Sequence, residues 1–404
     1  MPAIIEFPTV VQEALKVYAD VFSNKPERRH FAEYLTGLLV AERKSVLGIN
    51  REFAVTTDQS CLNRWITQAQ WDEKRMNDVR LESLQKDPAT RYSAQGVIAI
   101  DNVLVAHDGK LIEDVGYFWD HADQRYLIAH DYLIAGYVCT SGKHYPLEFR
   151  RFRKKEQCKE AHQQFKDHTR LFMELVDWVV AKRIPGDFTF DCYFTNVEIL
   201  NHIEEKKRGY VGDVKFNRKV CYKGQLMKVG ALAAQIPVED RRALEINGQK
   251  QYYYTKVVRV QKVRHLVRML ILWKHKDDDK PCKILWTNRI WWEASHILRV
   301  YRKRWTGTET FHRDGKQELG LGDCQLRDGR GHDRHLYLVF VAYSLLMSQL
   351  RQGRAREWAL MKLTTIGEAC RAVLRETIKK TIQWALRQYN EGRDPDEICW
   401  VLGC

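Results

Sequence analysis

The 404-residue chain can bury one large hydrophobic core or two to three smaller ones, and its 45% hydrophobic content, with 12 Trp and 18 Tyr, excludes a largely disordered protein. Lys and Arg exceed Asp and Glu by 66 − 52 = 14, and this excess is spread along the chain. Such a field suits a long polyanion, and a basic enzyme with a merely solvated surface is the alternative.

The 10 cysteines never occur as Cys-x-x-Cys, and the chain opens without a basic segment followed by an apolar one. We therefore expect reduced thiols in a cytoplasmic protein. The longest apolar run, LYLVFVAYSLLM at 336–347, is too short to span a bilayer and predicts a buried helix.

Residues 1–92 are predicted to form a small basic helical domain. The segments 28–46 and 60–85 place apolar residues three and four positions apart, beside Arg and Lys. This region is the best candidate for sequence recognition through a helix in the major groove of DNA, although the pattern does not identify the recognition helix.

The pattern changes at about residue 96 to β-branched and aromatic runs separated by turn residues. The predicted elements are strands at 97–103, 111–119 and 126–138, a helix at 157–183, a strand ending at Asp191, a helix at 195–206 and a strand at 209–215. This order is that of an RNase H-like half-domain.

The strand-like pattern continues from 216 to 290 and predicts an all-β insertion, after which helical periodicity returns. The fold class is therefore α/β, with an RNase H-like domain interrupted by the insertion and with helical N-terminal and C-terminal regions. The predicted divisions are 1–92 (DNA-binding), 93–215 and 291–350 (the two parts of the catalytic domain), 216–290 (insertion) and 351–404 (a C-terminal helical region for dimerisation).

Two aspartates follow apolar strands: Asp101 after GVIAI and Asp191 after FTF. If the two strands are neighbours, their carboxylates converge at the rim of the sheet, and with a third acid from a helix, Glu309, they can hold two divalent ions about 4 Å apart. Carboxylate oxygens suit Mg²⁺. The alternatives are that each aspartate is a turn or capping residue and that Glu309 is a solvated helix residue.

Three segments carry a resemblance to a known family: GVIAIDN, FTFDCYFTN with GYVGDVKFNR after it, and YRKRWTGTETFHRDGKQELGLGDCQLR. They resemble the DDE transposases of bacterial insertion sequences, in the group with a β-strand insertion domain and a Y-R-E-K signature. The signature residues fall in family order within the last segment: Tyr301, Arg304, Glu309 and Lys316.

The resemblance implies that Asp101, Asp191 and Glu309 bind two Mg²⁺ ions, with Mn²⁺ as a substitute. It also implies a homodimer that binds the terminal inverted repeats of a transposon and a target DNA, in the bacterial nucleoid. The residues expected to contact DNA are Tyr301, Arg304, Trp305, His312, Arg313 and Lys316. A repressor that has lost catalysis and an RNase H-like nuclease without strand transfer are the alternative functions.

The segment before Glu309 departs from the family, because four residues separate Arg304 from Glu309 where three are usual. At about 100° per residue, an unbroken helix would place them some 140° apart, whereas Glu309 and Lys316 would share a face. Since Thr306, Gly307 and Thr308 are poor helix formers, we predict a π-bulge or break at 306–308 that keeps Arg304 beside Glu309.

Several other residues have two interpretations. Trp305 either stacks on a base or lies in the core. His312 and Arg313 either touch phosphate or orient Glu309, and Asp314 is interpreted as a surface charge. Asn102 stands where the family often has a second aspartate.

The basic run 150–159 is either a DNA-backbone contact or a solvated loop. His332 and His335 lack further zinc ligands at usable spacing, so we interpret them as phosphate contacts or helix-entry residues.

Overall fold

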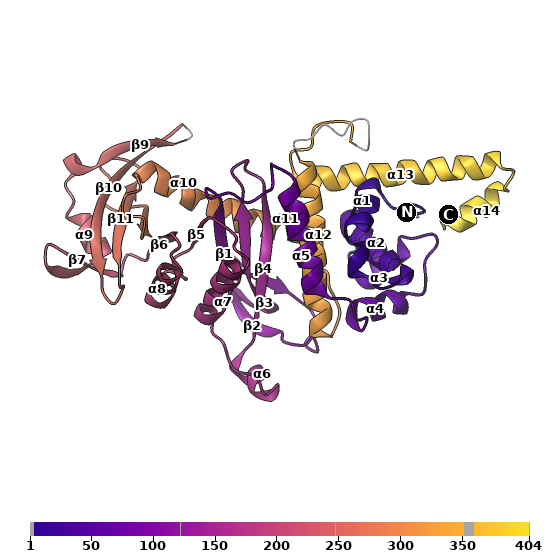
Figure 1. The fold of residues 1–404 in the computed structure, drawn as a ribbon, viewed down its shortest axis with the longest axis horizontal. Helices are drawn as coiled ribbons and strands as arrows, with labels where there is room; N and C mark the ends of the chain where they lie inside the picture. The colour runs from indigo at the N-terminus through magenta and orange to yellow at the C-terminus, as the bar shows by residue number, and fades with distance from the viewer. Residues whose placement is uncertain (1–3, 122, 247, 351–358, 404) are drawn as a thin grey trace. The chain divides into compact units, whose positions relative to one another are not determined.

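The structure, a computed structural model, describes residues 4–121, 123–246, 248–350 and 359–403 (Figure 1). It is a mixed α/β fold with a large mixed sheet. Two compact units divide the chain: unit 1 comprises Met1–Arg91, Leu104–His130 and Phe311–Cys404, and unit 2 comprises Tyr92–Val103 and Asp131–Thr310. Part of the predicted C-terminal helical region, 351–358, lies outside the described residues.

Unit 2 is built on a sheet in the order β4-β3-β1-β5-β6-β12-β11-β10-β7-β8, with β9 paired to β10. Its strands are β1 (Val97–Ala106), β3 (Arg125–Val138), β4 (His144–Phe152), β5 (Asp187–Phe190), β6 (Tyr210–Asp213), β7 (Lys219–Tyr222), β8 (Gln225–Lys228), β9 (Arg242–Ile246), β10 (Gln249–Val260), β11 (Leu266–Trp273) and β12 (Lys283–Thr287). β1, β5 and β6 run parallel, and the strands from β12 onward pair antiparallel. β1 ends in unit 1, and β3 begins there.

The helices of unit 2 are α6 (Lys155–Glu160), α7 (His168–Ala181), α8 (Val197–Glu205), α9 (Val229–Ala234), η2 (Val238–Asp240), α10 (Ala294–Arg304) and the π-helical turn η3 (Trp305–Glu309). α10 packs on β5, β6 and β9. Its residues Ile297, Leu298 and Val300 join one apolar cluster with β1, β3, β6, β11 and β12. This packing holds α10 against the sheet, and η3 follows directly at the end of α10.

Unit 2 differs from the prediction in three details. β4 was not predicted as a strand, although it pairs with the second half of β3 from Asp131 to Val138. The helix expected at 157–183 is two helices, because His162 adopts a positive φ of 51° after α6 and the Asp167 side chain caps α7 by accepting from the Arg170 N–H. The segment 216–290 is not entirely β, since α9 and η2 interrupt it.

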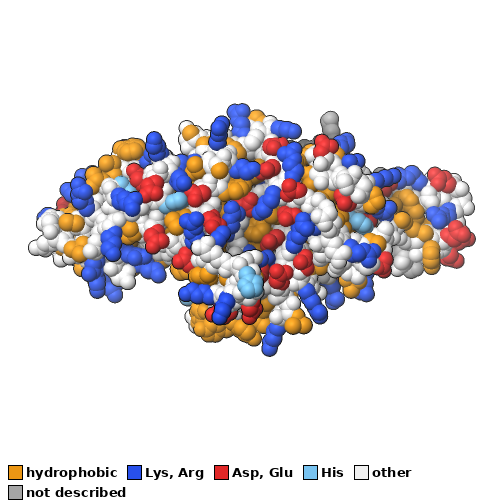
Figure 2. All heavy atoms as spheres, turned by 60° about the horizontal axis from the view of Figure 1, so that its bottom comes forward, with side chains coloured by type: hydrophobic (Ala, Val, Ile, Leu, Met, Phe, Trp, Pro, Cys, Tyr) orange, Lys and Arg blue, Asp and Glu red, His pale blue; other side chains and the backbone are white. Residues whose placement is uncertain are grey.

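The basic run 150–159 had two interpretations, a DNA-backbone contact or a solvated loop. It is divided between the end of β4 and α6, and Arg150 lies 3.7 Å from Glu174 and 3.6 Å from Glu148. Part of its charge is therefore paired inside unit 2. On the face drawn in Figure 2, Lys and Arg side chains are interspersed with Asp and Glu, as a positive excess spread along the chain would require.

Unit 1 is mostly helical. It contains α1 (Thr9–Val17), η1 (Ala19–Val21), α2 (Lys25–Val40), α3 (Val46–Arg51), α4 (Gln59–Thr67), α5 (Glu73–Lys86), β2 (Gly116–Asp120), α11 (Thr310–Glu318, from Phe311 on), α12 (Gly329–Gln349), α13 (Ile366–Asn390) and α14 (Pro395–Leu402). The helices predicted in 1–92 are present. β2 pairs with the start of β3 and is shorter than the predicted 111–119 strand.

α12 is the buried helix predicted from its apolar run, and it packs against α2, α4, α5 and α13. Asp328 caps its start by accepting from the Gly331 N–H at 2.8 Å. Among the helices that the structure describes, none combines the length and apolar composition needed to cross a bilayer.

Arg334 ties α12 to the N-terminal helices. Its side chain is fully buried, and it reaches Glu73 Oε2 at 3.2 Å. Its guanidinium also donates to four backbone carbonyls, Trp65 and Ile66 in the last turn of α4 and Ala69 and Trp71 in the connection to α5. One side chain therefore satisfies a run of carbonyls that no helix supplies with donors.

We predict that Arg334→Met lowers the free energy of unfolding of unit 1 by about 3 kcal/mol, because it removes the buried partner of Glu73 and the side-chain donor to the Ile66, Ala69 and Trp71 carbonyls. Urea titration followed by circular dichroism measures this change. Arg330→Met is the matched control: Arg330 lies 3.7 Å from the same Glu73 but its side chain is 44% exposed, so the expected loss is below about 1 kcal/mol. Equal losses in the two variants would contradict the assignment.

Candidate active site

The first two acids lie on adjacent parallel strands of unit 2. β1 and β5 pair in the register Val97↔Asp187 and Ala99↔Thr189. Extended by two residues past Ala99↔Thr189, this register brings Asp101 level with Asp191, which directly follows β5. Residues at one level on neighbouring strands project to the same side. The condition for convergence, that the two strands be neighbours, is therefore met.

β1 continues to Ala106, so Asp101 lies within the strand and does not end it. Asp191 directly follows β5, and its Oδ1 accepts the N–H of Tyr193 at 2.9 Å and of Phe194 at 3.4 Å. These are the contacts of a turn residue. Asp191 thus has the structural role considered for it from the sequence, and the turn holds its carboxylate in a fixed orientation.

The predicted irregularity before Glu309 is confirmed. α10 ends at Arg304, and residues Trp305–Glu309 form one π-helical turn, closed by the Thr310 N–H bonded to the Trp305 carbonyl. Because a π-turn bonds residue i to i+5, five residues complete approximately one turn. Arg304 and Glu309 therefore lie on one side, with Arg304 Nη1 3.4 Å from Glu309 Oε1.

Glycine allows this turn to approach the sheet closely. A Cβ added to Gly307 would lie 2.7 Å from the Ala99 Cβ, and one added to Gly136 would lie 2.1 Å from the Gly307 carbonyl oxygen. Ala99 precedes Asp101 by two residues and so projects from the same face of β1. The π-turn is consequently seated on the face of the strand that carries Asp101.

Arg304 links two of the acids. Its Nη1 donates to Asp101 Oδ2 at 2.6 Å as well as approaching Glu309. Burial raises the pKa of Asp101 to about 7, and the negative charges of Asp191 and Glu309 add to this increase, whereas Arg304 and the Asn102 N–H oppose it. The shift indicates that both other carboxylates are close enough to repel the Asp101 charge.

The three carboxylates do not form a single-ion cage. Among the described residues, the only group of three potential ligands with all ligand atoms within 4.8 Å is a histidine cluster elsewhere. Two ions about 4 Å apart would spread their ligands over a wider space than one ion does, so such a cage is not required. Asp101 is the acid whose charge interacts with both of the others.

A hydrogen-bonded chain that the sequence did not suggest connects the two aspartates. Asn102 Nδ2 donates to Asp131 Oδ1 at 3.2 Å, and Asp131 Oδ2 lies 2.7 Å from His168 Nε2. The His168 Nδ1 is 3.4 Å from the hydroxyl of Tyr193, whose N–H binds Asp191. Asp131 is buried inside a strand, where an unpaired charge is disfavoured. An aspartate within a predicted strand was therefore the available sequence signal that Asp131 has a partner.

The remaining residues of the signature have different environments. Tyr301 is buried, and its hydroxyl lies 3.2 Å from both Asp213 Oδ2 and Lys283 Nζ. Trp305 is 60% exposed, so the alternative that it is a core residue was wrong.

The other predicted DNA contacts lie on α11. His312 is buried, whereas Arg313 and Lys316 are exposed, and Arg313 pairs with Asp314 at 3.0 Å. α11 is α-helical from Thr310 to Glu318. The functional roles of these three residues stay predictions.

Two family models match the chain. The model described as DDE superfamily endonuclease matches residues 17–228, and the model described as transposase DDE domain matches residues 139–345. The first match contains Asp101 and Asp191, and the second contains Asp191 and Glu309. No curated protein matches the chain.

Each match spans more than half of the chain, which defines the class: a transposase-type nuclease whose substrate is DNA. The chain belongs to the DDE transposase family, whose superfamily generally uses divalent metal ions.

We predict that Gly136→Ala destabilises unit 2 by about 1–3 kcal/mol, because the added methyl group collides with the backbone carbonyl of Gly307, which can only move with the π-turn. Thermal and urea unfolding measure the loss. Gly322→Ala is the control, since no atom lies within 4 Å of the place that its added methyl group would occupy, and its effect should stay within about 0.5 kcal/mol. Equal stability of both variants would rule out the close approach.

The raised pKa of Asp101 predicts a pH dependence in the metal-free protein. Between the ordinary pKa of about 4 and the folded-state value of about 7, the folded protein binds more protons than the unfolded chain. Stability from this group is therefore present below pH 4 and is lost as the pH rises to about 7.

Asp101→Asn should make the fall of unfolding free energy with pH shallower across this window, measured by urea titration with a chelator present. The exposed Asp279→Asn serves as control and should keep the wild-type slope. An unchanged slope in Asp101→Asn would show that Asp101 does not titrate as described.

Proposed function

We propose that this protein is a DDE transposase that binds transposon ends, cleaves the DNA there and joins the freed 3′-hydroxyls to target DNA. The proposal rests on the convergence of Asp101, Asp191 and Glu309. The parallel β1–β5 register and the π-turn both contribute to this convergence. In the proposed RNase H-like core, the sheet order β4-β3-β1-β5-β6 supplies the scaffold, and the strands between β6 and α10 form the insertion.

The donor set fits two Mg²⁺ ions. Three carboxylates offer hard oxygen ligands, and Arg304 is the cation that bridges two of them. Bound divalent ions would supply activation of the attacking oxygen and stabilisation of the leaving oxygen at phosphorus. Mn²⁺, with the same ligand preference, would substitute.

Arg304 has two proposed roles. Its guanidinium holds Asp101 and Glu309 together in the absence of ions, and offers the phosphate a fork of donors once their charge is neutralised. Tyr301, held by Asp213 and Lys283, positions α10 one turn before Arg304.

Other residues would bind DNA. Trp305 presents an exposed ring beside the site for stacking on an unpaired base, and Arg313 and Lys316 supply charge for phosphates. The helices α1–α5 are proposed to bind the terminal repeats, and the C-terminal helices to support a dimer.

The test incubates the protein with Mg²⁺, a DNA carrying the element's own end and a target plasmid. Wild type should give joined product, and Asp191→Asn should lower its rate by more than about 100-fold, because even changes to groups that only hydrogen-bond a metal ligand cost about 10- to 100-fold. A gel-shift assay should show that the variant still binds the end. Asp314→Asn, which alters an acid of the same segment that pairs with Arg313, is the control and should keep activity.

The outcomes separate the two alternative functions. Cleavage without joining would identify a nuclease, and end binding with neither reaction would identify a transposase-derived repressor. Loss of joining on chelation and its return with Mg²⁺ or Mn²⁺ would support the assigned ions. Joining by Asp191→Asn at the wild-type rate would overturn the site.

A further inference from the structure

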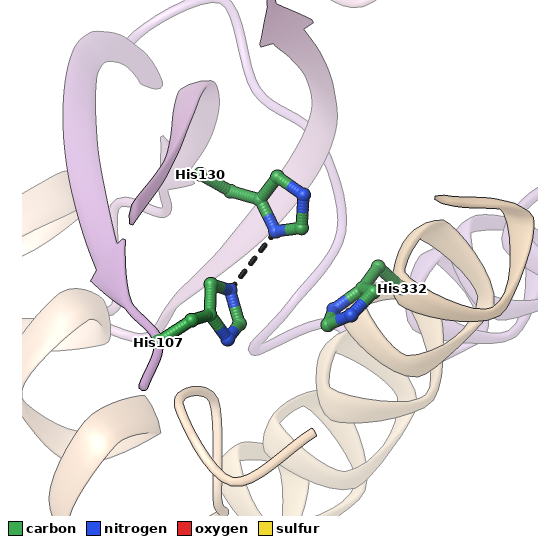
Figure 3. A group of neighbouring side chains, drawn as sticks. All are labelled: His107, His130 and His332. Atoms are coloured by element: carbon green, nitrogen blue, oxygen red, sulfur yellow. Dashed lines mark hydrogen bonds between the residues drawn. The ribbon is translucent and has the colours of Figure 1, made fainter. Parts of the chain in front are cut away.

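Three histidines from distant parts of the sequence meet in unit 1 (Figure 3). His107 directly follows β1, His130 lies in β3 and His332 lies in the first turn of α12. One ring nitrogen of each lies within 4.8 Å of the other two, and the ring centroids are 4.6–5.0 Å apart. His130 and His332 are buried, and His107 is partly buried.

Hydrogen bonds fix the orientation of two of these rings. His130 Nε2 lies 2.8 Å from the Glu113 carbonyl oxygen, and His332 Nε2 lies 2.7 Å from the Leu326 carbonyl oxygen. Because a carbonyl only accepts, each Nε2 carries the proton and each Nδ1 carries the lone pair. A ring with one nitrogen bonded to a backbone carbonyl and the other presenting a lone pair is the arrangement of metal-binding histidine.

The loops that supply the two carbonyls are themselves tied together. The Glu113 N–H donates to the Arg327 carbonyl at 2.9 Å, and Glu113 Oε2 accepts the Gly329 N–H at 2.7 Å, at the start of α12. The segment 107–116 and the entry to α12 therefore hold the rings from both sides.

His107 completes the group. Its Nε2 lies 2.9 Å from His130 Nδ1 and, without a cation, donates to it. Two nitrogens bound to one tetrahedral Zn²⁺ are about 3.4 Å apart, so this pair needs to open by only about 0.5 Å, and the widest pair to close by at most about 1.4 Å. The proton on His107 Nε2 would transfer to its own Nδ1, with no net proton released.

His335, the second histidine noted in the sequence, is excluded as a ligand. Its Nδ1 lies 2.8 Å from the Tyr34 hydroxyl and its Nε2 lies 2.8 Å from the Gly320 carbonyl, so both ring nitrogens are engaged. His332 and His335 are both buried, which overturns their interpretation as phosphate contacts.

We propose that His107 Nε2, His130 Nδ1 and His332 Nδ1 bind one Zn²⁺-type cation, with water at the fourth position. Imidazole nitrogens suit Zn²⁺ and Co²⁺ and are poor ligands for Mg²⁺, so this site is chemically distinct from the three carboxylates. The cation would join β3, the end of β1 and α12, and would stabilise unit 1.

Co²⁺ titration of the full chain tests the site, because four-coordinate Co²⁺ with nitrogen ligands gives intense visible bands and carboxylate-bound octahedral Co²⁺ does not. Wild type should develop these bands to one equivalent, and Zn²⁺ should displace the Co²⁺ and raise the melting temperature. His107→Gln and His332→Gln should each weaken Zn²⁺ binding by at least about 100-fold, measured against a chelating dye.

Two controls retain the three histidines: the exposed His275→Gln and the active-site variant Asp101→Asn should develop the same intense visible Co²⁺ bands as wild type. Circular dichroism of the metal-free histidine variants checks their fold. Absence of the bands in wild type overturns the proposal whatever the variants do, as do bands that persist in a folded His107→Gln protein.

Discussion

The repulsion of the Asp101 charge by two neighbouring carboxylates, Asp191 and Glu309, is the constraint on which the rest of unit 2 depends. Burial disfavours the charge on Asp101, and Asp191 and Glu309 disfavour it further. Such an arrangement persists only if the surrounding structure holds the acids in place and a cation compensates them. Arg304 supplies part of that compensation, with one nitrogen near both Asp101 and Glu309.

The scaffold meets this constraint with backbone geometry. Parallel pairing of β1 with β5 fixes the two aspartates at one level, and α10 packs against β5 and β6 so that its last turn reaches them. The extra residue in the signature is absorbed as a π-turn, and Gly307 lets that turn lie against Ala99. An unbroken α-helix would have directed Glu309 away from Arg304.

Features governed by local rules could be predicted from the sequence. The buried helix α12 and the strands that lead to Asp101 and Asp191 follow from periodicity and apolar runs. The π-turn follows from poor helix formers together with the one-residue departure from the spacing of the family that the segment resembles. β4 could not be separated from the basic run that overlaps it, and the break between α6 and α7 depends on a positive φ at His162.

The partners in contacts between distant segments could not be predicted from the sequence. Asp131 and His168 meet across 37 residues, and His332 meets His107 and His130 from beyond the whole insertion, so no ligand spacing marks either group. Only tertiary structure brings such residues together.

The central claim is that Asp101, Asp191 and Glu309 together bind divalent ions. The most direct measurement is Mn²⁺ binding by calorimetry, in a His107→Gln background that removes the histidine cluster. The account predicts binding that is lost on further change of Asp101, Asp191 or Glu309 to the amide and retained in Asp314→Asn. Equal Mn²⁺ binding by all of these variants would contradict it.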